Sequence, residues 1–412
     1  MKNKNAWITV CIVNLAIVAF LGFSLRTKFL FPIQFLDYRN LISAHSHFAF
    51  GGWVTLVLMV LLLDNFLSAA QQNKKSYVVI LWGILLSSYG MLITFPIHGY
   101  ALLSIIFSTS FIFFTYAFSW TFTRDAWRNQ LFITSRLLVT CSLLSLIISS
   151  IGPFWLAYMM ATHSGNANDM RDAVYTYLHF QYNGFFTLSV FALLFHQKIG
   201  NLSMAARQNI QQFAIILCLS IPPSLFLSLL WHYYNFYLRA IAFIGCGLIL
   251  LAVFLFFRIP HKKEKAFVHQ HKLPALLLNL SIASFVIKMI LQTGTIIPWL
   301  GNAVFGYRPI IIGFLHLVFL GLVTFYILSY FLEKGILSLQ LAVSKFAVVY
   351  FTAAVIFNET ILLTDGVGRL FKITNPIYDR LLWIASIGLF TGALLLIIAR
   401  IKSRATDPEN AL

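Results

Sequence analysis

The sequence is poor in charged residues, and acidic residues are the rarest among them. Only 10% of the 412 residues are charged, with 12 Asp and Glu against 29 Lys and Arg, whereas 60% are hydrophobic. Proline-rich linkers and low-complexity tracts are also missing. This composition argues against a soluble globular protein and against soluble domains joined by linkers.

Cysteine is scarce as well, and its few copies are scattered. Cys11, Cys141, Cys218 and Cys246 stand singly inside apolar stretches. They form neither a CxxC pair nor a disulfide framework, and the lack of CxxCH excludes a c-type haem attached to this chain. We expect all four to be small residues of the packed interior.

Long apolar runs, in contrast, recur from one end of the sequence to the other. Each is about 20 residues long, which suffices for a helix to cross a bilayer. We predict twelve membrane spans in one transmembrane domain over 1–412, an all-α fold in contact with the lipid bilayer. The runs are 7–25, 41–63, 77–97, 101–121, 137–158, 174–196, 210–231, 237–257, 274–298, 309–331, 341–362 and 381–399.

The net charge of +17 resides in the connections between these runs. That distribution argues against nucleic-acid binding. The N-terminus, the even-numbered loops and the C-terminus hold 19 of the basic residues, the odd-numbered loops hold 9, and Lys288 lies within a span. The positive-inside rule therefore predicts a multi-pass protein of the inner (cytoplasmic) membrane with both termini in the cytoplasm.

One run, LISAHSHFAFGGWVT over 41–55, contains two histidines, and ionisable residues inside a membrane are usually functional. Its second histidine starts a motif that recurs in the sixth and tenth runs: HFAFGGWVTL from His47, HFQYNGFFTL from His179 and HLVFLGLVTF from His316. The spacings of 132 and 137 residues are about a third of the chain. An internal repeat of this kind predicts three four-helix units around a pseudo-threefold axis, approximately 1–135, 136–272 and 273–412.

Each repeat has an Arg eight residues before the His, a Gly five residues after it and a Thr eight residues after it. These are Arg39, Arg171 and Arg308, then Gly52, Gly184 and Gly321, then Thr55, Thr187 and Thr324. At 1.5 Å per residue, each Arg lies about 12 Å above its imidazole, at the headgroup level, where it can pair with carboxylates. The Gly leaves room for a bulky group, and the Thr can return its hydroxyl to the helix backbone. The pattern fits a buried planar ligand near the external face.

His45 and His47 cannot both bind one metal axially, because two residues on a regular helix turn their side chains about 200° apart. The repeat selects His47 as the ligand. His45 then lies behind the ligand-binding residue, belongs to a neighbouring site, or only packs against other side chains. The alternative for all three repeat histidines is a hydrogen bond to another helix, which their matched depth and matched Arg disfavour.

Twelve spans in sets of four, with histidines on spans two, six, seven and ten, resemble subunit I of the haem–copper oxidase superfamily, which includes cbb-type oxidases and nitric oxide reductases. In that family span ten carries a His-x-His pair, and GFLHLVFLGLVTF aligns His316 with its second His and Phe314 with its first. The resemblance implies that His47 and His316 bind a low-spin haem b beside Gly52 and Gly321. It places Arg39 and Arg308 at the propionates. The ligand of the oxygen-reducing haem is missing.

The family's copper ligands lie on spans six and seven. His179 matches in position, and LLWHYYN retains one histidine, His232. The resemblance leaves open a copper site of His179, His232 and His98, or the alternative that His98 and His232 are interfacial residues at helix ends. Tyr182 follows His179 by three residues, so a His–Tyr cross-link is not supported. Residues expected near the sites are His45, Arg171, Lys288 and Tyr182.

The resemblance implies electron transfer or respiratory oxygen or nitric oxide chemistry, with a cytochrome or quinol as electron donor and other membrane subunits as partners. Two axial histidines fill the iron's coordination, so such a haem would carry electrons and would not bind gas.

Three alternatives stand beside this reading. The segment from His45 to Gly51 is similar to the HxHExxFG element of the NnrS family, haem- and copper-binding membrane proteins linked to nitric oxide metabolism. Twelve spans with internal repeats are also found in secondary transporters, although those repeats are usually twofold. The third alternative is a scaffold without cofactors.

The predicted orientation is tested by reporter fusions. Green fluorescent protein fused to the C-terminus should fluoresce, and alkaline phosphatase fused there should be inactive, because that end is expected in the cytoplasm. Phosphatase inserted at Asn166, in a predicted outer loop, should be active. An active C-terminal phosphatase would contradict the orientation.

Overall fold

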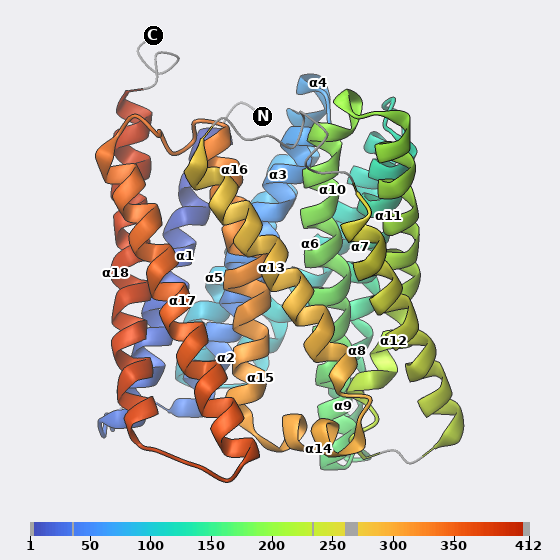
Figure 1. Cartoon of the computed structure of the whole chain (residues 1–412). Helices are drawn as coiled ribbons and strands as arrows, with labels where there is room; N and C mark the ends of the chain where they lie inside the picture. The colour runs from blue at the N-terminus through green and yellow to red at the C-terminus, as the bar shows by residue number, and fades with distance from the viewer. Residues whose placement is uncertain (1–3, 35–36, 233–234, 260–270, 407–412) are drawn as a thin grey trace.

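The computed structural model describes residues 4–34, 37–232, 235–259 and 271–406. Within these ranges it contains no strand, and twelve helices are long and apolar enough to cross a membrane. The predicted all-α architecture with twelve spans is therefore confirmed. The helices form one upright bundle, and its two termini emerge at the same end (Figure 1). The basic loop around 260–270, which contributes to the predicted cytoplasmic charge, lies outside the described residues.

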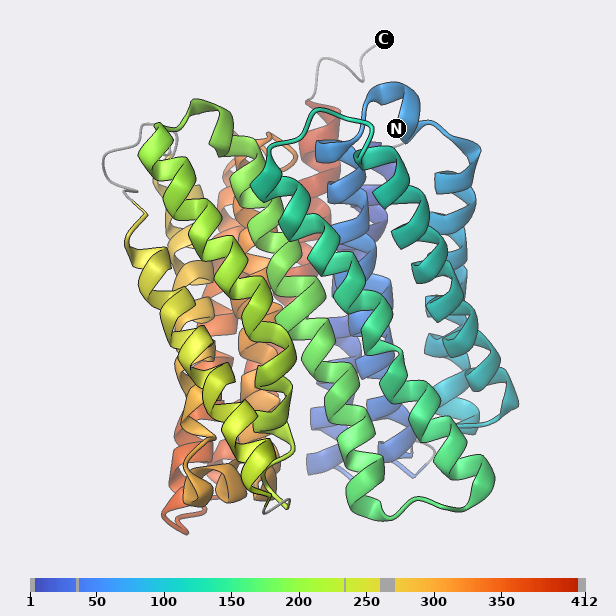
Figure 2. The same ribbon diagram turned by 90° about the vertical axis from the view of Figure 1, so that its right-hand side faces the viewer.

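Seven spans are single helices, and each overlaps its predicted run. They are α1 (Lys4–Leu30), α5 (Lys75–His98), α6 (Leu102–Ala126), α12 (Phe236–Phe257), α13 (Lys272–Gly294), α17 (Ala342–Leu370) and α18 (Ile377–Ala405). Two short helices lie in the connections, α4 (Ala69–Gln72) and α14 (Pro298–Gly306). Figure 2 shows the long helices from the side, tilted against one another.

The other five spans are composite, because the type of helix changes along four of them and the fifth is an α-helix interrupted at Ser150. They are α2–η1–α3 (Tyr38–Phe48, Ala49–Thr55, Leu56–Phe66), α7–α8 (Ile133–Ser149, Ile151–Thr162), α9–η2–α10–η3 (Ala167–His179, Phe180–Phe186, Thr187–Lys198, Ile199–Asn201), α11–η4 (Met204–Ser224, Leu225–Ser228) and α15–η6–α16 (Arg308–His316, Leu317–Thr324, Phe325–Glu333). The three spans that carry the repeat histidines are in this group.

Each repeat histidine is followed, within two residues, by a π-helix: η1, η2 or η6. Such helices are rare and are frequent at functional sites. The Thr187 hydroxyl donates to the Tyr182 carbonyl (2.5 Å) and the Thr324 hydroxyl to the Phe319 carbonyl (2.7 Å), in both cases five residues earlier. The predicted return of the Thr hydroxyl to the helix backbone is confirmed at these two positions.

The three π-helices meet in the centre of the bundle through one phenylalanine ring each. Phe50 of η1 lies 5.6 Å from Phe186 of η2 and 4.6 Å from Phe319 of η6, measured between ring centroids. The last pair, Phe186 and Phe319, is 5.3 Å apart. Trp53 adds a hydrogen bond from its indole nitrogen to the Thr324 hydroxyl (3.4 Å). The phenylalanine triad thus ties spans two, six and ten together.

Spans two, six and ten start at the end of the bundle opposite the termini. The local sequence explains at which residue each of them begins. The Asp37 carboxylate caps α2 by accepting from the Asn40 backbone, and Asn166 caps α9 through its side-chain oxygen. In span ten Pro309 occupies the first turn of α15, where no backbone N–H is needed. These starts place each repeat histidine two to three turns inside its span.

The three spans are not equally buried. In the most apolar stretch of spans two and six, 83% and 94% of the residues are buried, whereas in span ten only 50% are. None of the nine residues of α15 is fully buried, although this helix packs against α17. The part of span ten formed by α15 is therefore less closely surrounded by protein than spans two and six.

The close contact of η2 with α7 yields a test of the packing. A Cβ atom at Gly184 would collide with the Cβ of Ser145, whereas a Cβ at Gly247, in α12, would meet nothing within 4 Å. We expect Gly184→Ala to destabilise the protein by about 1–3 kcal/mol through overpacking. Gly247→Ala, the matched control, should be neutral or stabilising, since Ala has the higher helix propensity. Thermal unfolding in detergent measures the stability of both variants. Equal unfolding midpoints would refute the close contact of η2 with α7.

Candidate functional site

His45 of α2 and His316 of α15 come near one another, although they stand on different spans. Their rings lie close enough to interact electrostatically, and the Arg26 guanidinium of α1 is within range of both. Each imidazole is surrounded by protein yet retains accessible surface. Two neighbouring imidazoles with a cation nearby are suitable elements of a site for an anionic ligand.

The hydrogen bonds of His45 determine which ring nitrogen is available. Its Nδ1 atom lies 3.1 Å from the Val18 carbonyl, which can only accept, so Nδ1 carries the proton. The lone pair is then on Nε2. The His316 ring interacts with the Ile312 carbonyl one turn earlier, although its Nδ1 atom is buried without a hydrogen bond of normal geometry. A ring whose Nδ1 faces a carbonyl presents Nε2 to a metal, the arrangement common in metalloproteins.

His47, which the repeat selects as the ligand, points elsewhere. Its ring stacks on Phe95 of α5 with centroids 4.5 Å apart, and its Nε2 lies 3.1 Å from the Tyr100 hydroxyl. The two side chains point in different directions, as predicted: His45 contacts α1, whereas His47 contacts α5. Of the two histidines, His45 is the one whose ring interacts electrostatically with His316.

Cations gather above the His45–His316 pair. Arg26 interacts electrostatically with Arg308, Asp365 and Asp379, and the Arg308 guanidinium lies 5.1 Å from the centre of the Tyr38 ring. Arg308, which the sequence predicts at a haem propionate, is thus near Arg26. Arg39, its predicted counterpart, is exposed. Arg26 was missed, since it stands in span one, outside the repeat.

Gly22 is a second residue that the repeat does not reveal. A Cβ atom there would lie 3.3 Å from Cε1 of His45, so only glycine lets the imidazole approach α1 without displacement. Gly52 and Gly321 have packing contacts instead. A Cβ at Gly52 would meet the Phe48 ring at 2.6 Å, and one at Gly321 would meet Oγ of Ser284 at 2.5 Å. Gly321 also borders the cavity described below.

The His179 side chain is fully buried, and both of its ring nitrogens are engaged. Its Nε2 lies 2.8 Å from the Ile221 carbonyl, and the Asn183 amide lies 3.0 Å from its Nδ1. The Lys288 ammonium donates to the oxygen of the same amide. This chain of polar groups leaves His179 no nitrogen for copper.

The three histidines of the predicted copper site are not brought together. His98 is exposed at the end of α5, and His232 forms an ion pair with Asp172 (3.2 Å). Among the described residues, one group has the spacing of a metal site, Asp169, Asp172 and His232. His179, His232 and His98 therefore cannot share one ion in this arrangement. Arg171, beside this group, stacks on the Trp231 ring at 4.7 Å.

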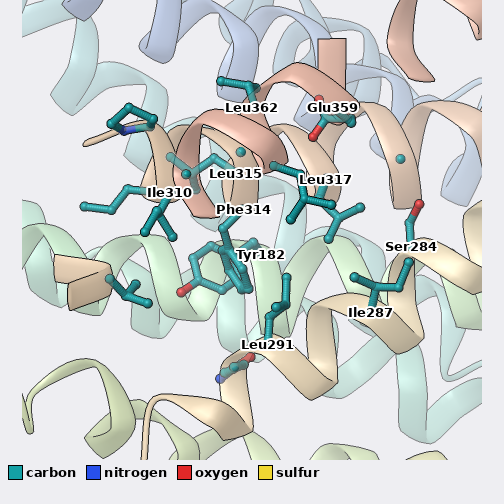
Figure 3. Close-up of a pocket in the computed structure, with 18 of the residues that line it drawn as sticks. Tyr182, Ser284, Ile287, Leu291, Ile310, Phe314, Leu315, Leu317, Glu359 and Leu362 are labelled. Atoms are coloured by element: carbon teal, nitrogen blue, oxygen red, sulfur yellow. The ribbon is translucent and has the colours of Figure 1, made fainter. Parts of the chain in front are cut away.

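A cavity of about 410 Å³ lies beside α15, and His316 is not among the residues that line it. It is enclosed by α9 and η2, α13, α15 and α17, and most of its lining is apolar. Phe314 and Tyr182 meet within it, with ring centroids 5.5 Å apart, and Figure 3 shows Glu359 and Leu291 on opposite sides of it. Phe314, which replaces the histidine that binds the high-spin haem in the resembled family, thus faces this cavity.

Comparison of the sequence with protein-family models and with curated proteins finds no match. The function of the site therefore follows only from its own residues and their geometry.

The Lys288–Asn183 contact yields a stability test. Asn183→Leu should destabilise the protein by about 1–3 kcal/mol or more, because it leaves a buried ammonium without its acceptor. Lys288→Met should cost less, since it removes the charge itself, and the double variant should be more stable than Asn183→Leu alone. Thermal unfolding in detergent measures the cycle. Additive effects of the two substitutions would show that the contact contributes nothing.

Proposed function

We propose that the chain is a membrane b-type haem protein in which His45 and His316 are the two axial ligands of a low-spin haem. The single observation that carries this proposal is their mutual position: two partly exposed imidazoles from different spans lie near enough to interact electrostatically, with the Arg26 guanidinium in range of both. The resemblance to haem–copper oxidase subunit I agrees with ligands on spans two and ten. In this proposal the ligand on span two is His45, in place of the His47 that the repeat selects.

The residues around the pair fit the group in two respects. Hydrogen bonding of the His45 Nδ1 to the Val18 carbonyl fixes the ring and leaves Nε2 to bind iron. Arg26 and Arg308 supply two positive charges, which match the two propionates of a haem, and a buried carboxylate requires such a partner. The acids Asp365 and Asp379 interact electrostatically with Arg26.

A bound haem would supply one-electron oxidation and reduction, and with two histidine ligands it would not take up gas. The chain's own residues hold the imidazoles in one tautomer, exclude water with the surrounding apolar helices and neutralise the propionates. Electron transfer is therefore the function that these residues support best. Oxygen or nitric oxide reduction needs a further site, and the grouping of His179, His232 and His98 that would provide copper is not present.

The three-unit arrangement is part of the same proposal. It is supported by the π-helices that follow His47, His179 and His316 and by the phenylalanine triad between them. An electron carrier of this fold would have its haem near the external face, within reach of a cytochrome or a quinol.

A reduced-minus-oxidised spectrum with a pyridine haemochrome assay tests the function. Purified protein should show a low-spin b-type haem, and His45→Ala and His316→Ala should each abolish that spectrum. His47→Ala is the matched control on the same helix and should retain it. Loss in His47→Ala with retention in His45→Ala would reverse the ligand assignment, and a spectrum retained in both His45→Ala and His316→Ala would exclude the proposed site.

A further inference from the structure

The cavity beside α15 opens sideways toward the bilayer. Ile287 of α13 and Leu363 of α17 border it and are 48% and 59% exposed, as expected of a portal between two lipid-facing helices. Along α17 it extends from Val355 to Leu370, roughly 22 Å at 1.5 Å per residue. A molecule with a long apolar part can therefore enter from the membrane without crossing water.

Polar groups are placed at two levels within this apolar space. Gln292 lines it, is only 6% exposed, and finds no hydrogen-bond partner for either its oxygen or its nitrogen. A buried amide without partners is costly, which indicates that a ligand satisfies it. Closer to the middle of the span, the Glu359 carboxylate also borders the cavity and accepts from the Asn358 amide (2.9 Å).

The charges of the lining decide the class of ligand. None of the described residues that line the cavity is Lys, Arg or His, so nothing there neutralises a phosphate, a fatty-acid carboxylate or haem propionates. A carboxylate and an amide instead suit an uncharged ligand with hydroxyl groups. The aromatic pair Phe314 and Tyr182 offers a surface on which a ring can stack.

We infer that this cavity binds an isoprenoid quinol, with its ring among Gln292, Glu359 and the Phe314–Tyr182 pair and its tail leaving between α13 and α17. The choice of a redox-active lipid rests on the proposed electron-transfer function, whereas the uncharged, hydroxyl-bearing, lipophilic class follows from the lining alone. The quinol would lie across α15 from His316, one helix away from the proposed haem.

The test uses the full chain, purified in detergent, and a radiolabelled photoreactive azido-ubiquinone as the probe. Labelled peptides should come from α13 and α17, and unlabelled ubiquinone should compete. Ile287→Trp fills the portal and should abolish labelling. Ile290→Trp is the matched control, because Ile290 is on the same helix, is 54% exposed and does not line the cavity. Gln292→Leu should weaken binding about tenfold, the loss expected for one hydrogen bond to a buried group.

Equal labelling of Ile287→Trp and Ile290→Trp would overturn the inference, as would competition by oleate or phosphatidylglycerol but not by ubiquinone. The outcome is independent of the haem. His316→Ala should lose the haem spectrum and keep the labelling, since His316 does not line the cavity. Protein without any haem whose labelling still depends on Ile287 would refute the proposed function and support the quinone site.

Discussion

The contact on which the rest of the bundle depends is the triad of Phe50, Phe186 and Phe319. These rings come from three spans far apart in the sequence and lie 4.6–5.6 Å from one another. Each stands in a π-helix, which rotates the residues before it relative to those after it. The triad therefore fixes how the outer half of each span is turned, and with it where His45, His179 and His316 point. The site is positioned from the centre of the bundle outward.

The three units use this common centre differently. The motif places Phe three residues after His47 and His316, but Tyr182 three residues after His179, and the central ring of that span comes from Phe186 instead. Tyr182 is thereby turned toward Phe314 and the cavity. Because of this departure from the repeat, span six contributes Tyr182 to the cavity beside span ten.

Sequence reasoning predicted the spans and the return of Thr187 and Thr324 to the backbone, because both follow from local spacing. It could not show that the ring of His45 lies near His316, since a repeat identifies equivalent positions and not neighbours in space. Arg26 and Gly22 lie in span one, outside the repeat, and reach the site only through tertiary packing. One signal was available for His179: Asn183 is four residues later, where a helix brings a side chain within hydrogen-bond reach. Its amide and the Ile221 carbonyl remove both nitrogens from metal binding.

The helix α15 divides two environments of opposite character. Toward α1 and α2 it presents His316 to an imidazole and to the arginines; toward α9, α13 and α17 it presents Phe314 to an apolar cavity without cations. Protein interiors are normally packed to the density of crystals, and empty apolar space forfeits the dispersion contacts that burial would supply. The open space beside α15, next to spans that are 83% and 94% buried, is therefore a place where a ligand would complete the packing. Since Arg26 is within electrostatic range of His316 and none of the described residues lining the cavity is a cation, the ligands proposed for these two environments differ in charge.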